Sequence, residues 1–320
     1  MSARSLVTGA NGFVGQHLCR ALQEHGGVRA LLRKHAEGPW DHAAIVDLGA
    51  ASLPAGLMDG IDVVYHVAGR AHVLDEAVEN VDAFRRVNVE GTRQVYQAAI
   101  AANVRCFVLV SSVAALADGG SGVIAENAEP RPASAYGQSK REAERIVLGQ
   151  PRVVWPVVLR LPLIYGPGAP GNLRRMIEVI RSGRFPPVPR IDNRRSMIHV
   201  DDVVRALILT GGRASAAGRA YTVTDGYAYS ARDVYEAIME SLGRRVPSWT
   251  VPASVLRGLA RIGDVAAAVT RRRWPFDTIA YEKLFGSAEY ECSAIVDELG
   301  FRPAWDLRRA MPAIVENTLR

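Results

Sequence analysis

Short apolar runs alternate with amphipathic stretches through the first half of the chain, and this alternation most constrains its fold. The apolar runs predict strands at residues 4–8, 28–32, 43–47, 61–67, 105–112 and 153–161. The stretches between them carry apolar residues at helical spacing and predict helices at Val14–His25, Ala83–Ala102 and Tyr136–Leu148. Near-continuous apolar strands separated by helices are typical of a parallel sheet buried on both faces. The sequence therefore predicts an α/β fold with a doubly wound parallel sheet.

The pattern loosens after Tyr165, where Gly, Pro and Arg become frequent. A strand is expected at Met197–Val200 and another at Ala220–Thr224. Helices are expected at Leu173–Arg181, Asp201–Leu209, Ser230–Leu242, Ala253–Val269 and Asp306–Leu319. No flexible linker separates the halves, so we expect a smaller lobe packed on the first domain.

Composition excludes several classes of protein. No apolar run approaches the roughly 18 to 20 residues that a membrane helix needs, and Met1–Thr8 offers no signal peptide. The net charge of +6 allows an anionic partner, but no nucleic-acid motif accompanies the Arg271–Arg273 cluster, which is read as solvated surface. Three distant cysteines give neither a disulfide framework nor a metal site. We expect a cytoplasmic protein without membrane, nucleic-acid or metal partners.

A glycine triplet lies between the first predicted strand and the first predicted helix. Gly9 permits a tight turn, Gly12 lets backbone approach a pyrophosphate, and Gly15 lets helix and strand pack closely. The helix N-terminus favours the negative charge. The pattern predicts a Rossmann-type dinucleotide site, with a cradle made of Gly9, Asn11, Gly12, Phe13, Val14 and Gly15.

The end of the second strand carries cations where NAD-specific folds carry a carboxylate. Arg33 and Lys34 follow residues 28–32, and no acidic residue stands there to bind the ribose hydroxyls. Cations suit the additional phosphate of NADP, so NADP(H) is the preferred cofactor and NAD(H) is possible. The alternative is an exposed basic turn.

Tyr136 and Lys140 are four residues apart, on one face of a predicted helix. A phenol with a pKa of about 10 is a poor acid or base at neutral pH, and a nearby ammonium is expected to lower that pKa. Ser112 ends the strand at 105–112, at the edge where parallel sheets bind ligands, and can align a carbonyl group. We predict a catalytic group of Ser112, Tyr136 and Lys140.

The order and spacing of further motifs resemble the extended short-chain dehydrogenases over about residues 4–210. The resemblance is carried by Gly9-x-x-Gly12-x-x-Gly15, Asp47-Leu48, His66-Val67-Ala68-Gly69, Asn88-Val89-x-Gly91-Thr92, Ser111-Ser112, Tyr136-x-x-x-Lys140, Leu159-Arg160-x-Pro162-x-x-Tyr165-Gly166-Pro167-Gly168 and Arg195-x-x-Ile198-His199-Val200-Asp201-Asp202. More narrowly, the chain is similar to the nucleotide-sugar epimerase, dehydratase and reductase group of the NAD-dependent epimerase/dehydratase family.

The resemblance implies roles for further residues. Asp47 and Leu48 would lie near the adenine, Lys140 would bind the nicotinamide ribose, and Arg195 would face a substrate diphosphate. Other implied cofactor contacts are Val67, Ala68, Gly69, Arg70, Asn88, Ser111 and Pro162, and other implied substrate contacts are Ser112, Val113 and Asn172. It also implies a homodimer, formed through the helices around Asn88–Ala102 and Tyr136–Leu148. His199 is expected to be structural.

The same resemblance implies how the chain divides. Residues 1–165 would form the dinucleotide-binding domain, with 192–226 returning to it, and residues 166–191 and 227–320 would form the substrate lobe.

The residues after Ser112 narrow the activity. Sugar dehydratases place acidic residues there, whereas this chain has Val113, Ala114 and Ala115. Dehydration is thus disfavoured, which leaves NADPH-dependent reduction of a UDP- or dTDP-linked 4-keto-6-deoxy sugar, or 4-epimerisation with retained NAD. Arg33 and Lys34 favour the reductase. A reductase of steroid-like substrates and a non-catalytic NADP-binding regulator remain alternatives.

Overall fold

A seven-stranded parallel sheet forms the centre of the larger lobe. The computed structural model describes residues 4–71, 81–149, 154–270 and 276–319. The sheet has the order β10-β7-β5-β4-β1-β2-β3, and every neighbouring pair runs parallel. Its strands are β1 (Ser5–Thr8), β2 (Val28–Leu32), β3 (His42–Ile45), β4 (Val63–His66), β5 (Cys106–Ser112), β7 (Trp155–Leu161) and β10 (Arg219–Thr222).

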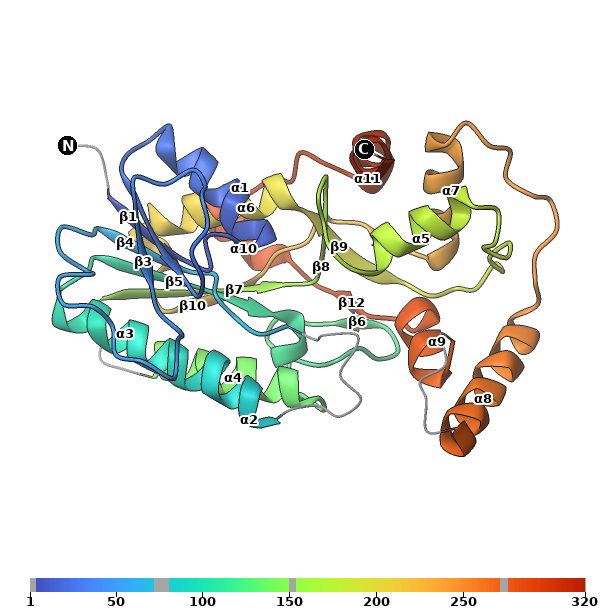
Figure 1. The fold of residues 1–320 in the computed structure, drawn as a ribbon, viewed down its shortest axis with the longest axis horizontal. Coiled ribbons are helices and arrows are strands. Elements are labelled where there is room, and N and C mark those ends of the chain that lie inside the picture. The colour runs from blue at the N-terminus through green and yellow to red at the C-terminus, as the bar shows by residue number, and fades with distance from the viewer. Residues whose placement is uncertain (1–3, 72–80, 150–153, 271–275, 320) are drawn as a thin grey trace.

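Helices cover both faces of this sheet because both faces of its strands are apolar (Figure 1). Val7 and Val108 point into a core completed by α1 (Phe13–Gln23) and α6 (Val200–Gly211). Leu6 and Phe107 point into the opposite core, which α3 (Gly91–Ala101) and α4 (Ala135–Leu148) complete. The predicted doubly wound Rossmann-type α/β fold is confirmed.

The crevice for a ligand follows from the strand order. The chain winds outward from β1 through β2 to β3, then returns to the other side of β1 with β4. The C-terminal ends of β1 and β4 therefore lie side by side at the point where the winding reverses, which is where open α/β sheets bind their ligands.

The predicted helix over 83–102 is interrupted. The structure has α2 (Val81–Phe84), a π-helical turn η1 (Arg85–Glu90) and then α3. Asn88 lies in this wider turn, where its side chain is buried and bonded to two other segments. A single period of 3.6 residues cannot show such a change, and π turns are common at functional sites.

The smaller lobe has a core of its own. A three-stranded sheet of order β11-β9-β8 combines β8 (Leu163–Tyr165), β9 (Arg195–His199) and β11 (Ala228–Tyr229). Apolar side chains of its strands and helices form a separate cluster that includes Tyr165, Ile177 and Met311. The helices of this lobe are α5 (Asn172–Arg181), α7 (Ala231–Ser241), α8 (Ala253–Thr270), α9 (Thr278–Phe285) and α11 (Leu307–Leu319).

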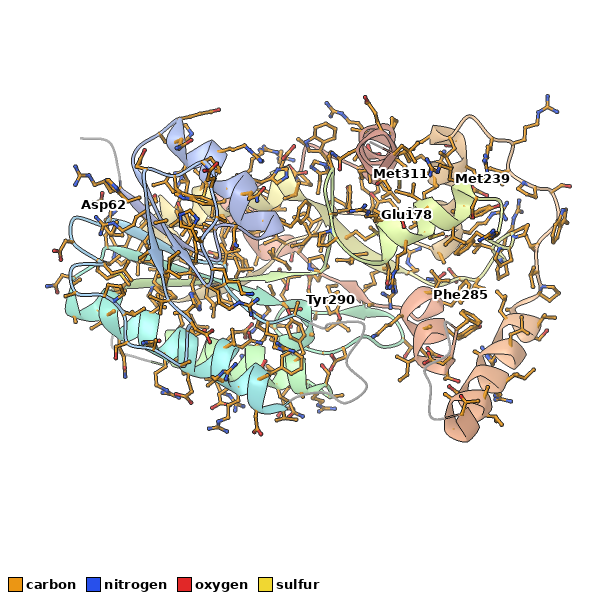
Figure 2. All side chains as sticks on the ribbon, in the orientation of Figure 1. Asp62, Glu178, Met239, Phe285, Tyr290 and Met311 are labelled. Carbon is orange, nitrogen blue, oxygen red and sulfur yellow. The ribbon has the colours of Figure 1, made fainter. Side chains whose placement is uncertain are left out.

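Short elements join the two lobes. β6 (Val123–Ile124) pairs with β12 (Glu289–Tyr290), and α10 (Ser293–Leu299) places Ile295 in the core between the large sheet and helices α1 and α6. The hydroxyl of Tyr290, labelled in Figure 2 where the two lobes meet, donates to the carbonyl of Ala117 at 2.7 Å. Single turns lie at η2 (Val113–Ala115) and η3 (Ala214–Ala216).

The segment 192–226 contributes to both lobes. Its α6 and β10 belong to the large α/β layer, whereas its β9 pairs with β8 and β11 of the smaller sheet. The exact division of the chain into a dinucleotide-binding domain and a substrate lobe stays a proposal.

Three further features bear on the expected partners. Among the described residues, no helix is long and apolar enough to cross a bilayer. The same residues hold no cluster of three His, Cys, Asp or Glu side chains suited to a metal ion. Cys19, Cys106 and Cys292 are free thiols.

Candidate active site

The turn between β1 and α1 forms a cradle of bare backbone. Gly9 has φ +66°, and a Cβ atom there would lie 2.8 Å from the Cα of Ala68. A Cβ on Gly15 would overlap the carbonyl oxygen of Gly9. Gly12 is the N-cap of α1, and within this fully described helix the first turn has neither an acidic residue nor a side-chain cap. Its free N–H groups and positive dipole end suit a pyrophosphate, so the turn fits a dinucleotide cofactor.

The residues expected at the adenosine end lie past β2 and β3. Arg33 and Lys34 directly follow β2 and are exposed to solvent. Asp47 is exposed, and Leu48 beside it is buried in the core. The two residues that directly follow β2 are thus basic, and neither is a carboxylate. The strand β2 neighbours β1, which leads into the cradle.

A buried histidine connects the cradle to η1 and α3. The backbone N–H of Ala68 donates to Thr8 Oγ1 at 3.0 Å, and the same hydroxyl shares a hydrogen bond of 2.9 Å with His66 Nδ1. The Thr92 hydroxyl donates to the Asn88 carbonyl at 2.6 Å, so it accepts from His66 Nε2 at 3.0 Å. These partners fix the neutral Nε2–H tautomer. Burial, with the charge of Lys140 added, lowers the pKa of His66 to about 3.

Asn88 continues this network to the predicted catalytic helix. Its Oδ1 accepts from the Arg70 N–H at 2.8 Å, and its Nδ2 donates to Ser139 Oγ at 2.9 Å. The Ser139 hydroxyl then donates to the Tyr136 carbonyl at 2.7 Å. Hydrogen bonds linked through Asn88 therefore connect Thr8, which precedes the glycine cradle, to the first turn of α4.

The structure brings Ser112, Tyr136 and Lys140 to one end of β5. The side chains of Tyr136 and Ser112 share a hydrogen bond. Lys140 is buried, and its Nζ donates to the Val110 carbonyl at 2.9 Å. A Cβ on Gly69 would lie 3.0 Å from that Nζ, so the loop after β4 borders the same group. The predicted catalytic side chains and the predicted nicotinamide loop thus meet.

The pKa of Tyr136 differs from the sequence-based expectation. An ammonium was expected to lower it, but burial raises it, and the hydrogen bond with Ser112 only opposes that rise. Burial also lowers the pKa of Lys140 to about 8, opposed by the charge of Glu144. The phenol is therefore protonated at neutral pH, as a proton donor requires.

Two acidic residues that the motifs did not reveal hold α4 in place. Glu144, fully buried one turn beyond Lys140, accepts from Arg160 at 2.8 and 3.0 Å and from the Ser111 hydroxyl at 2.7 Å. Asp118 accepts from the N–H of Ser134, the N-cap of α4, at 2.9 Å. The Ser111 hydroxyl thus points to Glu144, so its predicted cofactor contact stays a prediction.

The predicted substrate residues differ in their burial and local contacts. Val113 is buried in η2, directly after Ser112, whereas Pro162, a predicted cofactor contact, is half-buried between β7 and β8. Asn172 begins α5. The Arg195 side chain donates from Nε to the Gly286 carbonyl at 2.8 Å, and burial lowers its pKa. None of these contacts tests the predicted substrate roles.

His199 lies outside the catalytic group. Its ring stacks on that of Trp305 with the ring centres 4.6 Å apart, and its Nδ1 accepts from the Asp201 N–H at 3.2 Å. It caps α6, in agreement with the expected structural role.

Comparisons with known proteins identify relatives over most of the chain. The sequence profile of the NAD dependent epimerase/dehydratase family matches residues 5–223. UDP-glucose 4-epimerase of Vibrio cholerae is 28% identical over 78% of each chain. A 4-hydroxy-2-methyl-3-oxo-4-farnesyl-3,4-dihydroquinoline-1-oxide ketoreductase of Stigmatella aurantiaca is 31% identical, over 82% of this chain and 80% of its own. The solved structure of MoeE5 with UDP-glucuronic acid and NAD superposes with a TM-score of 0.78 at 26% identity, covering 99% of both chains.

Proposed function

Because this chain belongs to the NAD-dependent epimerase/dehydratase family, and is therefore an NAD(P)-dependent enzyme, we propose that it acts at C4 of a nucleotide-diphosphate sugar. The proposed reaction is the NADPH-dependent reduction of a 4-keto-6-deoxy sugar. The observation that carries this proposal is the half-buried Tyr136, whose side chain is hydrogen-bonded to Ser112 one helical turn before the buried Lys140.

The side chains divide the reduction between them. The bound nicotinamide supplies the hydride. Ser112 aligns the ketone oxygen, and Tyr136 donates the proton that completes the hydroxyl group. A phenol is protonated at neutral pH and burial raises its pKa further, which supports Tyr136 as the proton donor in the reduction. The ammonium of Lys140, at the border of the Gly69 loop, would hold the ribose of the bound cofactor and, one helical turn from Tyr136, would stabilise the phenolate left after donation.

The surroundings of Ser112 argue against loss of water as the reaction. A dehydratase needs an acid and a base beside the reacting sugar. The residues after Ser112 form η2, and Val113, Ala114 and Ala115 carry no titratable group. Reduction requires one hydride and one proton, and epimerisation requires a hydride and a proton to be removed and then returned, so Tyr136 is the only acid–base group that either reaction needs.

Arg33 and Lys34 support NADPH as the reductant. Both side chains are exposed directly after β2, where they are able to bind the phosphate that distinguishes NADP from NAD. A reductase exchanges its cofactor at each turnover, which also fits an accessible adenosine end.

A 4-epimerase that retains NAD is the second candidate. It is favoured by the similarity to UDP-glucose 4-epimerase and to MoeE5 bound to NAD. NAD that co-purifies with the protein and is released only on denaturation would favour this alternative. A preparation that takes up and releases NADPH freely would favour the reductase.

The nucleotide part of the substrate is tested separately. Arg174, Arg175, Arg184 and Arg195 give the smaller lobe the positive charge that a diphosphate requires. We expect UDP or dTDP to raise the melting temperature. A response to apolar ketones alone would favour a lipophilic substrate, such as the one that the Stigmatella ketoreductase is named for.

The deciding experiment is turnover with a panel of 4-keto sugars. The purified protein is incubated with NADPH or NADH and with UDP- or dTDP-linked 4-keto-6-deoxy sugars, and the loss of absorbance at the nicotinamide band is followed. The proposal expects consumption of NADPH with at least one member of the panel. Interconversion of 4-epimers without net consumption would replace it with the epimerase. The homodimer through α3 and α4 stays a prediction that sedimentation tests.

A further inference from the structure

The outer side of α8 carries an apolar stripe that the fold leaves uncovered. Val255, Leu259 and Ile262 are 49, 50 and 62% exposed, and the neighbouring Val265 is 64% exposed. Their spacing of four and three residues places the first three on one side of the helix. In Figures 1 and 2, α8 lies at the outer corner of the smaller lobe, with no described element on its outer side.

The inner side of α8 is fixed, so the stripe is unable to turn inward. Leu256 and Ala260 are buried in the core of the smaller lobe. Asp264 accepts from the N–H of Thr278 at 3.1 Å and from its hydroxyl, which ties α8 to the start of α9. The orientation of the stripe is thus a consequence of packing.

The net positive charge of the sequence is concentrated in the segment that includes this helix. Residues 243–276 contain seven arginines and one acidic residue, Asp264. The remaining residues contain 32 basic and 32 acidic side chains, so the net charge of +6 lies entirely in this segment. Arg257 and Arg261 on α8, and Arg245 before it, are exposed. Trp249, four residues before the helix, is 63% exposed.

We propose that α8 binds the surface of an anionic lipid bilayer. An amphipathic helix with exposed aliphatic residues, flanking arginines and a nearby tryptophan is suited to lie in the plane of a membrane interface. Anionic headgroups attract the arginines, while Val255, Leu259 and Ile262 enter the acyl boundary. This peripheral contact departs from the expectation of no membrane partner, which rested on the lack of a spanning segment.

Two other occupants fit these observations less well. A nucleic acid would satisfy the arginines, but its backbone offers nothing to four exposed aliphatic side chains. A second copy of the chain would cover the stripe, but a two-fold contact would bring two segments of the same positive charge together. An anionic bilayer satisfies both the charge and the apolar surface.

Flotation of the full chain with lipid vesicles tests this proposal. We expect binding to vesicles that contain phosphatidylglycerol and weak binding to pure phosphatidylcholine, with the difference reduced in high salt. The double variant Leu259→Ser/Ile262→Ser should bind phosphatidylglycerol vesicles about 100-fold more weakly, at about tenfold for each buried aliphatic side chain. The matched control Ile45→Ser removes a residue of similar exposure, 47%, from the distant strand β3 and should bind like the wild type.

Folding and the competing occupants are separated by further measurements. The double variant should keep the wild-type melting temperature and rate of NADPH oxidation, because its residues touch neither core nor active site. Vesicle binding by the double variant equal to that of the wild type would overturn the proposal. So would a wild-type dimer that the double variant loses without any vesicle binding, or binding of duplex DNA in place of vesicles.

Discussion

The buried His66 makes a quantitative prediction about stability and pH. In the folded protein its pKa is about 3, whereas an unfolded histidine titrates near 6.5. Between these values the unfolded chain binds a proton that the folded chain excludes, so stability falls as the pH is lowered through 6.5. From pH 7 to pH 5 this single side chain should reduce the free energy of unfolding by about 2 kcal/mol. Because pH 5 is two units above the folded pKa, the loss depends little on its exact value.

The variant His66→Asn isolates this contribution. Urea unfolding of the wild type and of the variant is measured at pH 7 and pH 5. The variant should be less stable at pH 7, because Thr8 and Thr92 lose hydrogen-bond partners in the core. Its further loss on going to pH 5 should be smaller than that of the wild type by about 2 kcal/mol.

The control is His35→Asn, which changes an exposed histidine after β2 and should keep the pH dependence of the wild type. An equal pH dependence in the wild type and in His66→Asn would refute the claim that His66 is held neutral by its partners.

Three further predictions concern the site. The kcat should fall as the pH rises through about 8, where the buried Lys140 loses its proton; a pH–rate profile that stays flat to pH 10 contradicts this. Gly15→Ala should reduce stability by about 1 to 3 kcal/mol and weaken NADPH binding, because the new methyl group overlaps the carbonyl of Gly9. The control for Gly15→Ala in thermal unfolding is Gly258→Ala, in open space on α8. Equal losses of stability in the two variants would refute the claim that the cradle has no room for a side chain at Gly15. Arg33→Asp should shift the ratio of kcat/KM for NADPH over NADH toward NADH at least tenfold, and an unchanged ratio removes the basis for NADPH.

Hydrophobic periodicity was sufficient for the large sheet and insufficient for the short elements. The run at 4–8 is β1, and the stretch 253–269 is α8, because long apolar patterns reflect burial directly. The helices α9 and α10, of eight and seven residues, were not predicted. Their patterns are shorter than the window over which a period is recognisable, and only the N-cap Asp277 marked the start of α9.

The candidate site was predictable where its chemistry lies within one segment. The interval between Tyr136 and Lys140 is a property of a single helix. The glycine cradle is likewise a property of a single turn. The hydrogen bonds of His66 join β1, β4 and α3, whose positions relative to each other follow only from the fold. The raised pKa of Tyr136 was missed for the same reason, since burial depends on every element packed around the phenol.

The central claim is that Tyr136 donates the proton to the substrate oxygen, and Tyr136→Phe tests it most directly. The variant removes the hydroxyl and keeps the ring, which packs against Phe84 with the ring centres 5.9 Å apart. Turnover and NADPH affinity are measured on the same preparation, by nicotinamide absorbance and by fluorescence titration. The account predicts a loss of kcat of at least 100-fold with an unchanged Kd for NADPH. A variant that turns over at the wild-type rate would contradict it.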